Sequence, residues 1–64
     1  MRVIDSKFLD TQVQIVLWRH GPWHYEIEYT AYKYPSERTY GTMEEAREQF
    51  DKRFNQYKRE PDQG

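Results

Sequence analysis

Two histidines and two glutamates lie close together in the middle of this 64-residue chain. His20 and His24 are its only histidines, and Glu26 and Glu28 follow them at alternate positions. Two imidazoles could begin a zinc site, for which a third ligand would have to come from Glu26 or from elsewhere in the chain. Structural zinc sites nearly always have four protein ligands, often cysteines, and this chain contains no cysteine. We therefore expect solvent-facing histidines at strand ends, and no metal ion or other cofactor.

Acid–base catalysis by Glu26 and Glu28 would need a pocket that shields one of them from water. A single sheet with one helix builds such a cleft poorly. Ser6 and Ser36 are the only serines, and neither lies in a nucleophile motif. The three glycines are widely separated, which excludes a glycine-rich phosphate loop. The sequence therefore predicts a binding protein without catalytic activity.

The histidines and glutamates border or belong to two segments in which apolar and polar residues alternate. Residues 12–19 and 24–32 have the period of two that is typical of half-buried strands. The segment His20–Trp23 between them contains Gly21 and Pro22, which favour a turn. Two such strands around a short turn predict a β-hairpin. Its inward side chains would be Val13, Ile15, Leu17, Tyr25, Ile27, Tyr29 and Ala31.

A helix is predicted to begin after Thr42. Thr42 and Glu45 have the spacing of a capping box, in which each side chain accepts a hydrogen bond from the backbone N–H of the other residue. Pro61 marks the end of the helical segment. The apolar stripe that would pack on the core consists of Met43, Ala46, Phe50, Phe54 and Tyr57.

These elements predict one α+β domain over residues 1–60, in which an antiparallel β-hairpin or three-stranded meander packs on one C-terminal helix. Residues 38–40 are the candidate third strand, and residues 61–64 are a frayed tail. Residues 1–10 form either an edge strand or an arm that folds over Val16 and Trp18.

The composition narrows the classes of partner. Ten basic and eleven acidic residues give a net charge of −1, whereas nucleic-acid-binding proteins usually carry a basic excess or stripe. No apolar run is long enough to span a membrane, and the first nine residues lack the apolar stretch of a signal peptide. We expect a cytoplasmic protein, in the host cytoplasm if a phage encodes it, that does not bind membranes.

Aromatic residues make up 17% of the chain, and several must lie on the surface. The outward face of the hairpin would carry Trp18, His20, His24, Glu26, Glu28 and Tyr32. Aromatic side chains in a polar surround are typical of interaction surfaces. We expect a protein partner to bind this aromatic sheet face or a free strand edge. In size and composition the chain resembles small phage or mobile-element proteins that inhibit or modulate a host protein.

Part of the hairpin also resembles the AP2-type DNA-binding domain. Gly21, Trp23, Glu26 and Ile27 match the G-x-W-x-x-E-I pattern of that family's second strand. The stretch that leads into the family's helix is matched by Tyr40-Gly-Thr, Glu44-Glu-Ala and Phe50-Asp. The resemblance covers residues 12–54 and implies a three-stranded sheet, backed by one helix, that enters the DNA major groove. Phage integrase arm-binding domains are similar in layout.

The resemblance makes DNA binding the alternative to protein binding. The implied contacts are Arg19, Lys33 and Arg38 with phosphates, and Trp18, Trp23 or His24 near bases. The strands carry fewer arginines than those of the family, and Glu28 would face phosphates. The spacing between Gly41 and Glu44 is also shorter than the family's. A third hypothesis is a homodimer formed through the same aromatic face, which would enlarge a small core.

Overall fold

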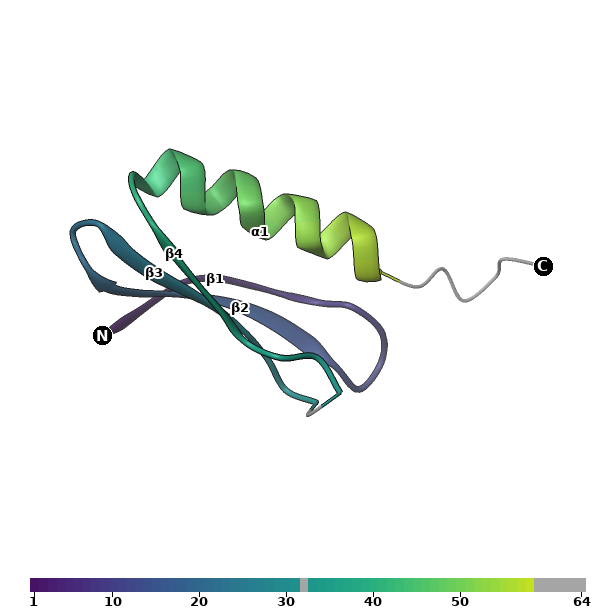
Figure 1. Cartoon of the computed structure of the whole chain (residues 1–64). Coiled ribbons are helices and arrows are strands. Elements are labelled where there is room, and N and C mark those ends of the chain that lie inside the picture. Colours follow the sequence, from purple (N-terminus) through teal and green to yellow (C-terminus); the bar gives the residue numbers. More distant parts are fainter. Residues whose placement is uncertain (32, 59–64) are drawn as a thin grey trace.

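The computed structural model describes residues 1–31 and 33–58. A four-stranded antiparallel sheet is followed by one helix that crosses one side of it (Figure 1). In chain order, which is also the order in the sheet, the elements are β1 (Arg2–Phe8), β2 (Gln14–Gly21), β3 (His24–Tyr29), β4 (Glu37–Tyr40) and α1 (Met43–Tyr57). The predicted α+β meander on a C-terminal helix is confirmed, with β1 as an additional strand. The predicted tail and Pro61 lie outside the described residues.

The capping box predicted for α1 is present. The Thr42 hydroxyl accepts a hydrogen bond from the Glu45 N–H at 3.2 Å, and the Glu45 carboxylate accepts one from the Thr42 N–H at 2.9 Å. Gly41 precedes them with a φ of 143°, a backbone conformation that residues other than glycine rarely adopt. A Cβ on Gly41 would also collide with the Glu45 carboxylate. The sequence Gly-Thr-x-x-Glu therefore sets where the helix begins.

The core lies between α1 and the two central strands. Its buried residues are Leu9, Ile15, Leu17, Tyr25, Ile27, Tyr29, Ala46 and Phe50. The inward faces predicted for the hairpin and the helix are confirmed, because these residues include alternate positions of β2 and β3 and two positions of the helical stripe. Met43, Phe54 and Tyr57 pack against the core and are partly buried. Ala31 is half-buried and follows the end of β3.

The first ten residues contain an edge strand, since β1 pairs beside β2 instead of folding over Val16 and Trp18. The pairing shifts between Val3 and Asp5, which are opposite Trp18 and Leu17, respectively. This extra residue is a β-bulge, and it reverses the alternation of every side chain that follows it. The bulge therefore turns Asp5 and Lys7 toward α1 and turns Phe8 to the opposite side of the sheet.

The turn of the central hairpin is shorter than the sequence predicted. β2 continues through His20 and Gly21, so that the reversal is made by Pro22 and Trp23. A second irregularity in the pairing lies between Arg19 and Gly21, opposite Tyr25 and His24. The prediction that His20 belongs to the turn is thus wrong, because the bulge at this point lets pairing continue to Gly21.

Three ion pairs connect α1 to the sheet. Lys7 Nζ lies 3.4 Å from Asp51 Oδ1, and Arg47 Nη1 lies 3.6 Å from Asp5 Oδ2. Arg53 binds the Glu37 carboxylate with two nitrogens, Nε at 2.6 Å and Nη2 at 3.1 Å. Exposed ion pairs add little stability individually, but these fix the helix over both edges of the sheet. Among the described residues, no helix is both long and apolar enough to cross a membrane.

Tyr29 closes the core at the C-terminal end of the helix. Its ring contacts those of Tyr34 and Tyr57 at centroid distances of 5.3 and 5.7 Å. Its hydroxyl is buried and has no hydrogen-bond partner among the described residues. Burial, with a smaller effect from the Glu37 carboxylate, raises the pKa of Tyr29 to about 12. The folded protein therefore keeps Tyr29 in its neutral form.

Candidate functional site

The side of the sheet opposite α1 is not covered by any described element (Figure 1). We call this side the open face. Strand register defines its members, because directly paired residues share a face. Val3 lies opposite Trp18, Phe8 opposite Gln14, and His24 opposite Tyr40. The open face thus includes side chains from all four strands.

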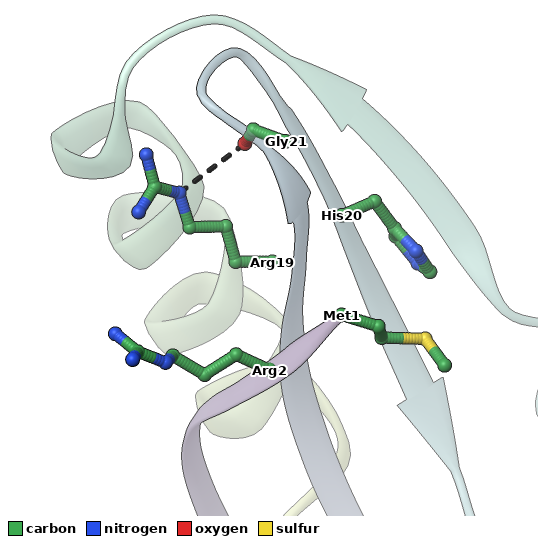
Figure 2. A pocket seen from close by; sticks show the side chains of 5 residues that line it. All are labelled: Met1, Arg2, Arg19, His20 and Gly21. Atoms are coloured by element: carbon green, nitrogen blue, oxygen red, sulfur yellow. Dashed lines mark hydrogen bonds between the residues drawn. The ribbon is translucent and has the colours of Figure 1, made fainter.

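Four of the five exposed large apolar side chains of the described residues lie on the open face. Five large apolar side chains are exposed within the described residues, and their exposed fractions are Met1 82%, Val3 48%, Phe8 61%, Trp23 63% and Tyr40 70%. Val3, Phe8 and Tyr40 belong to the open face by register, and Met1 points to the same side as His20 (Figure 2). Only Trp23 lies elsewhere, in the β2–β3 turn. The helix contributes none of these residues.

Two glutamates on β3 are bound by side chains of β2. Trp18 Nε1 donates a hydrogen bond to Glu28 Oε1 at 2.8 Å. His20 Nε2 lies 2.6 Å from Glu26 Oε1, and only 20% of the histidine side chain and 17% of the glutamate side chain are exposed. The prediction of solvent-facing histidines is therefore wrong for His20, because neighbouring strands bring it against Glu26. Since both carboxylates already have partners, a protein that covers this face would leave neither of them unpaired.

A row of rings continues from this pair to the last strand. The His20 and His24 rings have centroids 5.0 Å apart, and the His24 and Tyr40 rings stack at 4.7 Å with an angle of 13°. Arg38 Nη1 lies 3.3 Å from His24 Nε2. Because an arginine can only donate, His24 Nε2 is the acceptor in this contact. The row holds the Tyr40 ring at the edge of the open face.

Two observations on the open face bear on metal binding and catalysis. No three side chains of His, Cys, Asp or Glu in residues 1–31 and 33–58 come close enough together to hold a metal ion. The His20–Glu26 pair has the chemistry of a general base with its orienting carboxylate. A nucleophile would be the third member of such a site, and no described hydrogen bond connects the pair to Ser6 or Ser36.

The structure brings the predicted protein-binding residues together. Trp18, His20, His24, Glu26 and Glu28 form one connected group on the open face. Tyr32, the sixth member of the predicted set, lies outside the described residues.

The predicted nucleic-acid contacts do not share one surface. Arg19 is on the covered side of β2, since it is opposite the buried Tyr25. Arg38 is on the open face, since it is opposite Glu26. Lys33 follows β3 at the other end of the sheet, where its Nζ lies 5.4 Å from the centre of the Tyr34 ring. Trp23 lies in the β2–β3 turn, at the opposite end of the sheet from Lys33.

Sequence reasoning missed Met1, Val3, Phe8 and Tyr40 as members of the open face. The alternation of the short segment 37–40 carries a signal for Tyr40, because Tyr40 shares a face with Arg38. No comparable signal exists for Phe8. Simple alternation from Ile4 would place Phe8 in the core, and only the bulge moves it outward.

Both edges of the sheet have features that oppose the addition of another strand. β1 contains the bulge and the inward-pointing charges of Asp5 and Lys7, each of which is paired with α1. β4 has only four residues and begins two residues after Pro35. Bulges, inward charges and short edge strands are common ways in which proteins prevent edge-to-edge pairing. Both edges are therefore poorly suited to pairing with a strand of another chain.

Comparison with protein-family models, with curated proteins and with solved structures finds no match for this chain. The resemblance to AP2-type domains therefore remains a prediction. The fold and the side-chain geometry are the basis for any proposal about function.

Proposed function

We propose that this protein is a non-catalytic module that binds a protein partner through the open face. One observation carries the proposal. Four exposed apolar side chains, Met1, Val3, Phe8 and Tyr40, lie on a single side of the sheet that no described element covers. Exposed apolar side chains among polar residues are the usual composition of a protein–protein interface.

The charges of the open face favour a protein over a nucleic acid. Among the described residues, Arg38 is the only arginine or lysine that the register places on this face, and it lies opposite Glu26. Glu28 is also on this side. Phosphate contacts by lysine and arginine supply most of the affinity for nucleic acids, and this face offers few of them. The DNA-binding alternative predicts binding of a mixed-sequence duplex that weakens steeply with salt, which fluorescence anisotropy at low and moderate salt measures directly.

Strand addition is the less favoured way of binding, because both edge strands oppose it. We therefore assign the contact to side chains of the open face. Phe8 and Tyr40 lie at opposite edges of this face, on β1 and β4, with Trp18 between them on β2. Aromatic side chains of this kind are the residues that most often dominate binding energy in interfaces.

The test is quantitative affinity capture from a nuclease-treated lysate of the source organism, with three forms of the protein as bait. The first is the natural sequence, and the second carries Phe8→Ser and Tyr40→Ser on the open face. The third carries Glu48→Ser and Lys52→Ser, two exposed helix residues whose joint removal also leaves the net charge unchanged. We expect a protein that is retained by the first and third forms and lost from the second.

Two other results would decide against the proposal. Equal recovery of the captured proteins by all three baits would show that the open face does not bind them. Sedimentation of the pure protein as a dimer, abolished by the same open-face substitutions, would instead support the homodimer hypothesis. The hypothesis that binding inhibits or modulates the partner is tested by assaying the captured protein with and without this chain.

A further inference from the structure

Two arginines lie directly opposite each other at one end of the sheet. Arg2 of β1 pairs with Arg19 of β2. Figure 2 shows both guanidinium groups directed to the same side of the sheet, while Met1 and His20 point to the other. With Gly21 these four residues line a shallow pocket of about 190 Å³. Like charges directly opposite each other on neighbouring strands are destabilising, so this pair is an unfavourable arrangement unless an anion joins it.

Three other charged residues of the sheet have helix partners of opposite charge. On the same side of the sheet, Lys7 pairs with Asp51, Arg47 with Asp5, and Arg53 with Glu37, as described above. Neither Arg2 nor Arg19 forms an ion pair within the described residues.

The Arg19 side chain is already oriented by the fold. Its Nε donates to the carbonyl oxygen of Gly21 at 3.3 Å, and the side chain is half-buried. The hydrogen bonds of the described residues do not use its two terminal nitrogens. Arg2 is exposed, so a ligand can approach the pair from solvent. A guanidinium has five N–H donors in a planar fork, which matches the oxygens of phosphate and carboxylate groups.

We propose that Arg2 and Arg19 bind a phosphate group that carries two negative charges, such as inorganic phosphate or a phosphate monoester. Two unpaired guanidinium groups neutralise a phosphate monoester, whereas a carboxylate or a phosphodiester supplies one charge only. Inorganic phosphate, a phosphorylated metabolite and a phosphorylated side chain share this chemistry. The two guanidinium groups lie on the opposite side of the sheet from Val3, Phe8 and Tyr40, whereas Met1 and His20 line the pocket from the open face. Phosphate binding by the two arginines does not rest on the proposed protein-binding function.

The experiment is a titration of the folded, isotope-labelled protein with inorganic phosphate at pH 8, followed by the NMR signals of the arginine Nε–H groups and of the Gly21 amide. Ionic strength is held constant with sodium chloride. We expect saturable shifts at Arg2, Arg19 and Gly21, with a Kd that is roughly millimolar because the site is open to water. Phosphoserine should bind similarly, and dimethyl phosphate and acetate more weakly.

Arg2→Gln is the decisive variant, because the Arg2 side chain is exposed and its removal should leave the fold intact. We expect it to weaken phosphate binding by about tenfold, the loss of one charge-assisted contact. Arg38→Gln removes the same charge from the open face and should leave the affinity unchanged. Shifts that fail to saturate, or equal losses in Arg2→Gln and Arg38→Gln, would show that phosphate responds only to the overall charge, and would overturn the proposal. Equal affinity for acetate would also overturn it.

Discussion

The two faces of the same sheet differ in what their side chains contact. On the face toward α1, Ile15, Leu17 and Ile27 are at most 1% exposed. Three charged residues at its margin, Asp5, Lys7 and Glu37, are paired with the helix. On the open face, Phe8 and Tyr40 are more than half exposed, although Glu26 and Glu28 on the same face have side-chain partners. The helix of the same chain covers one face. The other face is uncovered, and it carries exposed apolar side chains beside carboxylates that already have hydrogen-bond partners.

This difference matters because the domain is small. A chain of about 60 residues buries only about 60% of the surface that its unfolded form exposes, so apolar side chains are scarce for the core. In this protein several large apolar side chains nevertheless lie outside the core. A bulge in β1 places Phe8 on the open face and directs Asp5 and Lys7 toward the helix. An uncovered patch of this kind is explained more simply by a partner than by folding.

The largest expected effect is a loss of stability from a substitution on the covered face. Phe50 is 1% exposed and lies at the centre of the stripe of α1 that packs on β2 and β3. Phe50→Ala should lower the free energy of unfolding by about 3–5 kcal/mol, since it removes a buried ring and leaves a cavity. A domain of this size has a total stability of roughly the same magnitude. Circular dichroism with urea should find the variant largely unfolded at 25 °C, and a folded variant with a normal midpoint would contradict the assigned core.

The next effect is a loss of stability at high pH that involves only the covered face. The pKa of Tyr29 is raised by burial to about 12 from an ordinary 10.0. Between these values the folded protein holds a proton that the unfolded chain has released, so the free energy of unfolding falls as pH rises, by at most about 1.4 kcal/mol per pH unit. Below pH 10 this contribution is fully present.

Urea unfolding at a series of pH values between 9 and 12 measures that slope. Tyr29→Phe should reduce it and, because it removes an unpartnered buried hydroxyl, should not destabilise the protein at neutral pH. Tyr40→Phe is the matched control on the open face, because Tyr40 is 70% exposed and its substitution removes no buried hydroxyl. An unchanged slope in Tyr29→Phe would contradict the burial of this hydroxyl.

A smaller effect concerns the start of the helix that covers one face of the sheet. Thr42→Ala removes the hydroxyl that accepts from the Glu45 N–H and should cost about 1 kcal/mol. Thr42→Ser keeps the hydroxyl and should behave like the natural protein. Both are compared by thermal unfolding, and indistinguishable midpoints for alanine and serine would show that the capping box contributes nothing.

The smallest effect is expected on the open face. Phe8→Ala removes a ring that is 61% exposed, and its stability should change by less than about 0.5 kcal/mol, as for most surface substitutions. Phe8→Ala and Phe50→Ala are the same substitution on opposite faces, so the difference between their changes in unfolding free energy compares the two faces directly. A loss above about 2 kcal/mol would mean that Phe8 belongs to the core.

The central hairpin and the helix could be predicted from sequence because their signals are local. Alternation determines which side chains of β2 and β3 face inward, and the Thr42–Glu45 spacing marks the helix start. The prediction of Trp18, His20, His24, Glu26 and Glu28 as one outward group depended on the same alternation.

The rest depended on contacts between residues far apart in the chain. The bulge between Val3 and Asp5 is a single extra residue with no distinctive composition, yet it decides the direction of Phe8. Lys7 finds Asp51 only once α1 has docked. Likewise, the sequence does not show that Arg2 and Arg19 lack acidic partners, because this depends on which charged residues of the sheet and of α1 lie next to each other in the fold.

The central claim is that the open face is a binding surface for another protein. The most direct measurement replaces Phe8 with the photoreactive residue benzoylphenylalanine in cells of the source organism, with Glu48 on the exposed side of α1 replaced in parallel. We predict that irradiation produces a discrete adduct with a second protein from position 8 and none from position 48. No adduct from position 8, equal adducts from both positions, or an adduct at twice the 8.0 kDa mass of this chain would contradict the claim.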